Sequence, residues 1–275
     1  MSRPFVSVIT PSYNRREFLP FLIHQFNYQT YPKHLMELII LDDSPVSNED
    51  IIPKDDTRIK YIYSSEKLFL GKKRNMLNSM AKGDIIVCMD DDDYYSKERV
   101  SHAVYKLMSA PNIKIAGSTN LHIYYPHIQK IYKFGPYGPY HGTNGTLAYK
   151  KSYLIDHNYI DDKMKAEEGH FTKDFSEPMI QLDPYKTMIC LAHTRNTVEK
   201  IPFIPSGELT SHKIHKFFKD NDKKMLNRIN ELIMLYKWAL AHLLLASHIL
   251  RISIIVLKPT SGDQDQFACS KHLLL

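Results

Sequence analysis

The stretch that decides the fold reads DIIVCMDDDD and covers residues 84–93. Asp84 to Met89 is a short apolar run that follows Gly83, and this pattern predicts a buried strand. Four consecutive carboxylates, Asp90 to Asp93, come directly after it. Because like charges repel one another at the edge of a buried sheet, we expect a cation close to them.

The acidic run has two interpretations. Mg²⁺ and Mn²⁺ take oxygen ligands and are commonly shared between carboxylates and substrate phosphates, so the run predicts a site for a divalent cation and a diphosphate. Alternatively, it is a solvated acidic loop or the start of the helix expected at Lys97–Met108, since aspartate favours the first turn of a helix. The run alone does not decide between them.

Strands and helices alternate before the acidic run. We interpret their order as βαβαβαβ, which is typical of an α/β fold with an open, mostly parallel sheet and helices on its faces. Besides the strand at Asp84–Met89, strands are expected at Phe5–Thr10, Leu38–Leu41 and Ile59–Tyr63, and helices at Glu17–Tyr28 and Gly71–Lys82.

Polar residues follow several of these strands. Asn14 lies in the turn after the first strand, Asp43 comes directly after the second, and Asp90 to Asp93 follow the fourth. Ligands of open α/β sheets bind beyond the carboxyl ends of the strands. We therefore expect these side chains to converge on one site.

The second half of the chain changes character. Tyrosine-rich strands are expected around Ile113–Ala116, His122–Tyr125 and Lys130–Phe134, followed by a Gly/Pro stretch at residues 135–139. Up to about Pro205 we expect a smaller mixed α+β layer that faces the same cleft.

A helical extension is predicted for residues 206–257. Trp238–Leu257 is apolar and long enough to cross a membrane. It contains His242, His248 and Arg251, and an arginine near the centre of a spanning helix costs roughly 2.5–3.5 kcal/mol on insertion scales. We therefore favour a helix that lies against a membrane surface or packs on the protein. The polar tail, residues 258–275, is predicted to be disordered.

Net charge and cysteine content exclude few classes of protein. The formal net charge is +6, which suits an anionic partner such as nucleic acid, an acidic membrane or a diphosphate, or a merely solvated basic surface. Cys88, Cys190 and Cys269 lack the paired spacing of a disulfide framework or zinc ribbon. With no signal-peptide pattern at the N-terminus, we expect a cytoplasmic protein.

Three further segments are candidates for chemistry. Gly71 and Arg74 stand at a helix start, where backbone N–H groups attract anions, although a basic helix cap is equally compatible. Glu168 offers a general base, against the alternative of a surface glutamate. His193 with Cys190 makes only half a zinc site, and a lone histidine is more often structural.

Together these pieces resemble the family 2 glycosyltransferases of the GT-A fold, over roughly Pro4 to Lys200. The motifs that carry the resemblance occur in the family's order. They are VSVITPSYNR at residues 6–15, LDDS at 41–44, Gly71 with Arg74 and Asn75, and MDDDD at 89–93.

The resemblance implies roles on the donor side. Pro11 and Tyr13 would line the nucleotide pocket, Asp43 would accept a hydrogen bond from the base, and Gly71 and Arg74 would lie near the nucleotide or diphosphate. In the family's Asp-x-Asp motif, Asp90 would contact the ribose and sugar, Asp91 would fill the variable position and Asp92 would bind the metal. Asp93 stays open between metal support and a helix-start role.

The resemblance also implies roles for the second half. The loop His141–Thr146 would lie beside the donor sugar. Glu168 would be the catalytic base of an inverting transfer, although the family usually has Glu-Asp where this chain has Glu167-Glu168. His193 matches a C-terminal metal-binding histidine of some members. Residues 1–110 would bind the nucleotide, and residues 111–205 would bind the acceptor.

The sequence therefore predicts transfer of a sugar from a nucleoside diphosphate sugar, with UDP-sugars favoured, to a glycan, lipid or protein hydroxyl, with Mn²⁺ or Mg²⁺. The alternatives are a GT-A-like nucleotidyltransferase, whose glycine-rich triphosphate loop is not evident, and a non-catalytic carbohydrate- or nucleic-acid-binding protein. We do not expect nucleic acid as a partner. Peripheral membrane contact is expected through the C-terminal helices, and the oligomeric state is left open.

Overall fold

The computed structural model describes residues 3–217 and residue 231. All of them belong to one compact unit, residues 1–236. The predictions for Trp238–Leu257 and for the tail after it lie outside the described residues. Within the described part, no helix is long and apolar enough to cross a membrane.

A seven-stranded sheet forms the centre of the fold, with strand order β10-β6-β9-β4-β1-β2-β3. Strands β4, β1, β2 and β3 run parallel, whereas β9 is antiparallel to both β4 and β6. The prediction of a mostly parallel α/β sheet is confirmed. The strands are β1 (Val6–Ser12), β2 (Met36–Asp42), β3 (Ile59–Tyr63), β4 (Ile85–Cys88), β6 (Ile115–Gly117), β9 (Ala148–Lys150) and β10 (Ile180–Gln181).

Both faces of this sheet are buried, and the side chains alternate strictly between two cores. On β4, Ile85 and Val87 face one core, while Ile86 and Cys88 face the other. This period of two follows from the pleat of a strand, and a strand buried on both faces reads as a continuous apolar run. One core is covered by α1 (Leu19–Tyr28) and α3 (Arg99–Ser109), and the other by α2 (Leu70–Met80) and α4 (Glu168–Phe171).

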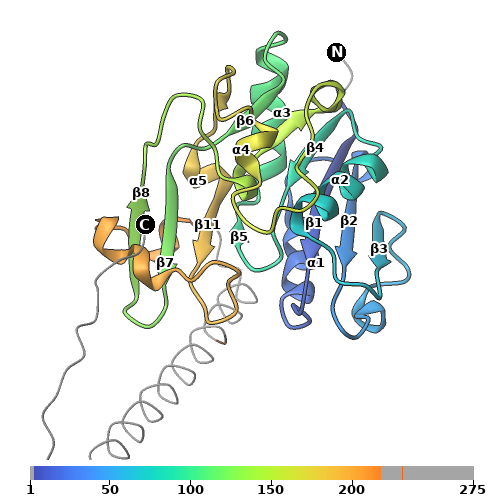
Figure 1. The fold of residues 1–275 in the computed structure, drawn as a ribbon, viewed down its shortest axis with the longest axis horizontal. Coiled ribbons are helices and arrows are strands. Elements are labelled where there is room, and N and C mark those ends of the chain that lie inside the picture. The colour runs from blue at the N-terminus through green and yellow to red at the C-terminus, as the bar shows by residue number, and fades with distance from the viewer. Residues whose placement is uncertain (1–2, 218–230, 232–275) are drawn as a thin grey trace, which may run out of the picture. The chain divides into compact units, whose positions relative to one another are not determined.

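A second, five-stranded sheet has the order β12-β8-β7-β11-β5. In Figure 1, β7 and β8 lie on the opposite side of the molecule from β1 to β3, with β5 and β11 between them. The strands are β5 (Tyr94–Tyr95), β7 (Leu121–Tyr125), β8 (Lys130–Phe134), β11 (Met188–Leu191) and β12 (Glu208–Leu209). The short helix α5 (Pro184–Thr187) precedes β11, and its first turn is capped by the Asp183 side chain, which accepts from the Tyr185 amide.

Two details differ from the sequence prediction. No α-helix joins β2 to β3, which are linked by a loop with one 3₁₀ turn at Glu49–Ile51, so the order is not a strict βαβαβαβ. This connection contains Pro45 and Pro53, which interrupt a helix. In addition, β12 pairs with β8, so the second sheet continues past the boundary predicted at residue 205. Further 3₁₀ turns are at Lys33–Leu35, Asn144–Thr146, Lys151–Ile155, Ile201–Ser206 and Ile214–Lys216.

A buried glutamine fixes the short link between the two sheets. Gln25 on α1 is fully buried, and its amide nitrogen donates to the Asp93 carbonyl at 2.9 Å. Its amide oxygen accepts from the backbone N–H of Tyr95, the last residue of β5. One side chain thus satisfies both backbone groups that flank Tyr94, and it fixes the direction of the chain after the acidic run.

We expect Gln25→Leu to lower the free energy of unfolding by about 2 kcal/mol, because it leaves a buried carbonyl and a buried amide without partners. Urea unfolding measures this loss. Lys54→Leu, a change at an exposed position, should stay within about 0.5 kcal/mol of wild type. Equal losses in both variants would contradict the role given to Gln25.

Candidate active site

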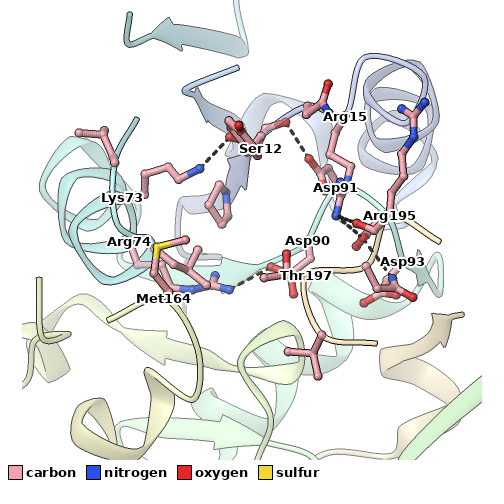
Figure 2. Close-up of a pocket in the computed structure, with 18 of the residues that line it drawn as sticks. Ser12, Arg15, Lys73, Arg74, Asp90, Asp91, Asp93, Met164, Arg195 and Thr197 are labelled. Atoms are coloured by element: carbon pink, nitrogen blue, oxygen red, sulfur yellow. Dashed lines mark hydrogen bonds and ion pairs between the residues drawn. The ribbon is translucent and has the colours of Figure 1, made fainter. Parts of the chain in front are cut away.

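A pocket of about 580 Å³ lies where β1 and β4 end. Its volume is within the range of pockets that bind small molecules. Figure 2 shows Lys73 and Arg74 reaching toward it from α2, with Arg15 on the other side. It is lined by Pro11, Ser12, Tyr13, Asn14, Arg15, Lys67, Leu68, Leu70, Lys73, Arg74, Asp90, Asp91, Asp92, Asp93, Met164, Cys190, Arg195, Asn196, Thr197, Val198 and Lys200.

The Asp90 side chain is 27% exposed, more than those of Asp91 and Asp92. Its Oδ1 accepts from the Arg74 guanidinium at 3.2 Å. The Tyr95 hydroxyl accepts from the Asp90 amide at 2.7 Å, which holds the backbone of the run in place. Gly145, in the predicted sugar loop, packs so close that a Cβ there would lie 2.9 Å from Asp90 Oδ2.

Asp91, which the family resemblance places at the variable position of the motif, is held by two partners. It is 5% exposed, and its Oδ2 accepts from the Ser12 hydroxyl at 2.7 Å. Its Oδ1 lies 3.7 Å from Arg15 Nε. Asn14 adopts φ 55°, a conformation that asparagine tolerates better than most residues. This turn follows β1 directly and precedes Arg15, which contacts the carboxylates.

Asp92 contacts two residues that are distant in the sequence, His193 and Arg15. Its Oδ2 lies 3.2 Å from His193 Nε2 and 3.3 Å from Arg15 Nη2. Asn196 Nδ2 lies 3.0 Å from the same histidine nitrogen and 3.4 Å from Asp92 Oδ2. The structure therefore brings together the two residues predicted to bind the metal.

Asp93 has a structural role. Its Oδ1 accepts from the backbone N–H of Leu191 at 2.9 Å, so it ties the acidic run to β11. It is 6% exposed and lies before β5, well ahead of the first residue of α3, so the helix-start role predicted as one alternative is wrong.

The four carboxyl groups differ in charge because their surroundings differ. Burial and the charges of Asp92 and Asp90 raise the pKa of Asp93 to about 8. Burial and the charge of Asp92 also raise the pKa of Asp91 well above its usual range. Burial acts in the same direction on Asp92, but His193 and Arg15 outweigh it and lower the pKa of Asp92 below its usual range. Asp92 is thus the member of the run best suited to binding a cation.

Lys73 connects α2 to the ends of β1 and β2. Its ammonium donates to Asp43 Oδ1 at 2.6 Å and to the Ser12 carbonyl at 2.8 Å. The second Asp43 oxygen accepts from the Leu68 amide at 2.7 Å, and the Asp43 side chain is fully buried. Contact between Asp43 and a nucleotide base stays a prediction, and it requires Lys73 or Leu68 to share this carboxylate.

Gly71 does not offer its amide to a diphosphate in this structure. The Gly71 N–H donates to the Lys163 carbonyl at 3.0 Å, and the Lys72 N–H donates to the Asp161 carbonyl at 3.2 Å. A Cβ at Gly71 would lie 1.9 Å from the Ile160 carbonyl oxygen. Glycine is needed here because the loop after Ile160 covers the start of α2, and the anion role predicted for Gly71 is corrected to a packing role.

Arg74 links the acidic run to α4. It is 3% exposed, and its Nε donates to Glu167 Oε1 at 2.8 Å. The same glutamate oxygen accepts from Asn144 Nδ2 at 2.8 Å. Glu168 follows as the first residue of α4, half-buried, and burial together with the Glu167 charge raises its pKa.

The predicted residues fall into two groups. The residues that line the pocket are Pro11, Tyr13, Arg74, Asp90, Asp91 and Asp92. Asp43 and His193 contact lining residues, and Gly71 follows one in the chain. Glu168 is one step further away, since it follows Glu167, which accepts a hydrogen bond from the lining residue Arg74. Tyr13 is 37% exposed, and the Lys67 ammonium lies over its ring.

Sequence reasoning gave no role to several residues that the pocket uses. Arg15 ends the first quoted motif, and Lys73 lies between Gly71 and Arg74, so both stood inside a recognised segment. Asn196 carried no signal, because its contact with Asp92 joins positions 104 apart in the chain.

The profile of the family described as "Glycosyl transferase family 2" matches residues 7–160, more than half of the chain. The chain belongs to glycosyl transferase family 2. The family predicted from the sequence is confirmed, and so is its GT-A fold.

Curated relatives of this family 2 chain match over part of their length. The Bacillus subtilis (strain 168) protein described as putative teichuronic acid biosynthesis glycosyltransferase TuaG is 34% identical over 110 residues, 38% of this chain and 43% of that protein. The Staphylococcus aureus (strain Mu50 / ATCC 700699) poly(ribitol-phosphate) beta-N-acetylglucosaminyltransferase TarS is 29% identical over 101 residues, 35% of this chain and 18% of that protein. The chain therefore aligns with less than half of each of these relatives.

Solved structures share the fold of this family 2 chain. The Pyrobaculum calidifontis mannosyltransferase PcManGT, in complex with GDP-Man and Mn²⁺, has a TM-score of 0.57 at 15% identity and covers 92% of this chain and 81% of that one. S. aureus TarS 1-349, in complex with UDP-GlcNAc, has a TM-score of 0.53 at 20% identity and covers 70% of this chain and 60% of that one.

We expect Gly71→Ala to destabilise the protein by about 1–3 kcal/mol, because the new methyl group collides with the Ile160 carbonyl and the backbone has to move. Gly138→Ala is the matched control, since a Cβ there meets nothing within 4 Å. Thermal unfolding compares the two variants. If Gly71→Ala melts like Gly138→Ala, the close approach of the loop to α2 is wrong.

Proposed function

We propose that the chain transfers a sugar from a nucleoside diphosphate sugar to an acceptor hydroxyl, with inversion at the anomeric carbon. The observation that carries this proposal is the chain of contacts from Asp90 through Arg74 to Glu167. It holds Glu168 close to the acidic run and connects a group suited to taking a proton with a pocket suited to a diphosphate. The release of free nucleotide from a panel of nucleotide sugars, with Mn²⁺ present, tests the proposal.

The donor would occupy the pocket between β1 and α2. Pro11 and Tyr13 offer surface for a base, and the Arg74 Nη1 atom is buried at the pocket without a hydrogen-bond partner. Such a donor suits a diphosphate oxygen. The PcManGT and TarS structures hold GDP-Man and UDP-GlcNAc respectively. We favour a UDP-sugar for this chain, on the strength of the family resemblance.

Asp92 and His193 would hold the divalent cation. Their oxygen and nitrogen atoms lie 3.2 Å apart, and Asp92 stays ionised. Among residues 3–217, no group of three or more such side chains gathers as a closed metal site, which suits an ion whose remaining ligands come from the diphosphate and water. An imidazole in the set favours Mn²⁺ over Mg²⁺. When bound, the cation would neutralise charge on the departing diphosphate.

Side chains of the protein would carry out the proton transfer and stabilise the leaving group. Glu168 would accept the proton of the acceptor hydroxyl as its oxygen attacks the anomeric carbon. The bond between that carbon and the diphosphate oxygen would break, and its electron pair would leave with the nucleoside diphosphate. Arg74 would stabilise the charge that develops there, because its guanidinium is already oriented by Glu167 and Asp90.

The acceptor is proposed to be a hydroxyl of a glycan, free or linked to lipid or protein. Two relatives support this class by their printed names, which refer to teichuronic acid biosynthesis and to poly(ribitol-phosphate). A third is named for a sugar linked to diphosphoundecaprenol.

We expect Asp92→Ala to abolish Mn²⁺ binding, because it removes the ionised oxygen ligand. Mn²⁺ binding is measured independently of activity, by the loss of the electron paramagnetic resonance signal of free Mn²⁺ during titration with protein. Nucleotide release should fall in parallel. Asp50→Ala, which breaks an exposed pair with Arg16, is the control and should bind Mn²⁺ like wild type. Unchanged Mn²⁺ affinity in Asp92→Ala would remove Asp92 from the metal site.

We expect Glu168→Gln to lower the turnover of sugar transfer by about 10²–10⁴-fold while nucleotide binding is retained, because an amide cannot accept the proton. In wild type, Glu168 has to be ionised and its pKa is raised. Activity should therefore decline on acidification at a pH above the ordinary glutamate value of about 4.3. Glu49→Gln, at an exposed position, should keep both properties. A fully active Glu168→Gln would refute this base.

A further inference from the structure

A second pocket, of about 570 Å³, lies on the second sheet. Residues of β7, β8, β12 and α5 line it, together with the segment that follows β12. Among the described residues, none lines both this pocket and the one at the acidic run. We call it the sheet pocket. Strand β11 connects the two regions, since it pairs with β7 and contributes Cys190 to the first pocket.

His122 lines the sheet pocket and has unmet hydrogen-bonding capacity. It is 2% exposed, and neither of its ring nitrogens has a hydrogen-bond partner. Burial, followed by the charges of His212 and Lys133, lowers the pKa of His122 to about 4, so the ring is neutral at pH 7. A neutral imidazole carries one donor and one acceptor. Neither the donor nor the acceptor of this ring forms a hydrogen bond within the fold.

A second buried polar atom lies in the same pocket. Asn120 Oδ1 is buried and also lacks a partner. Native proteins leave few such groups unsatisfied, and a ligand that supplies the missing bonds is one explanation for a cluster of them. Three orphan atoms, one on Asn120 just before β7 and two on His122 within it, point to hydrogen bonding with a molecule that offers both donors and acceptors.

The two charged side chains that line the pocket offset one another, and a further cation, Lys216, lies beside it with its ammonium 3.0 Å from His212 Nε2. Lys133 and Glu208 face each other across β8 and β12 at 3.6 Å, so their charges offset one another. The remaining polar groups include the hydroxyls of Thr210 and Ser211, which serve as donors and acceptors alike.

An aromatic wall completes the sheet pocket. The Tyr185 ring lies 5.2 Å from the His122 ring, and its hydroxyl forms a 2.7 Å hydrogen bond with His212 Nε2. Pockets with aromatic surface and a few convergent polar groups bind small polar organic molecules. A sugar ring has this combination, because it presents C–H faces for an aromatic ring and hydroxyls that both donate and accept.

We propose that the sheet pocket binds a saccharide unit of the acceptor glycan, remote from the unit that receives the new sugar. The role as an acceptor site rests on the proposed function, whereas saccharide binding itself does not. Hydrogen bonds from sugar hydroxyls to His122 and Asn120 would orient the unit, and Tyr185 would pack against its ring. The pocket would thereby select a glycan chain long enough to reach from the second sheet to the acidic run.

The test uses the full chain, fluorescently labelled, on a printed array of oligosaccharides of hexoses, N-acetylhexosamines and uronic acids, without nucleotide sugar. We expect wild type to bind a subset of these glycans. The affinity for the best binder, measured by calorimetry, should fall about tenfold or more in His122→Phe and in Asn120→Leu, because each removes a buried hydrogen-bonding group. Absence of wild-type binding on the array, or unchanged affinity in both variants, would overturn the proposal.

Controls separate this proposal from folding effects and from the proposed function. His34→Phe makes the same change at an exposed site and should bind glycan like wild type. His122→Phe should unfold at or above the wild-type temperature, because the His122 side chain makes no hydrogen bond in the fold. If inorganic phosphate competes with the glycan at unchanged ionic strength, the pocket is an anion site and the proposal of a saccharide site is overturned. Glu168→Gln should bind glycan like wild type. Glycan binding is therefore tested independently of the proposed transfer reaction.

Discussion

The concentration of negative charge at the end of β4 is the constraint on which the rest of the structure depends. Four adjacent carboxyl groups are held where water is largely excluded, and each element around them contributes a group that offsets their repulsion. Ser12 comes from β1, Arg74 from α2 and the Leu191 amide from β11. These elements converge because their partners are carboxylates on one short stretch of backbone. The result is one strongly ionised group, Asp92, among neighbours that are neutralised or tied into the fold.

The same neutralisation connects the two halves of the protein. Asp93 holds β11, which belongs to the second sheet, while Asp90 holds Arg74 and through it Glu167. Arg74 and the segment that carries Glu167 and Glu168 are thus placed by one network. Ala166, which precedes the two glutamates, adopts φ 52°, an unfavourable conformation for a residue with a Cβ. The bonds of Glu167 to Arg74 and Asn144 offset that cost.

The sequence predicted the parts of the fold that depend on local pattern. The apolar runs of β1 to β4 are evident because both faces of the sheet are buried, and the positions after them carry polar residues. The pairing of Asp92 with His193 followed from family resemblance, since a contact across about a hundred residues leaves no local signal. The packing role of Gly71 was not predictable, because it depends on where the loop after Ile160 lies. Asp93 was ambiguous for the same reason, as its partner Leu191 belongs to a distant strand.

The loop that covers the start of α2 has a consequence for how this protein can be recombined with its relatives. The family match ends at residue 160, which makes that position an inviting junction for a chimera. Several contacts that hold the loop against α2 cross this junction, since Gly71 donates to the Lys163 carbonyl and Arg74 donates to Glu167. A transplanted segment that ends at residue 160 would lack the residues that cover the start of α2 and orient Arg74. A chimera of this chain is therefore expected to keep these contacts only when its junction lies after α4.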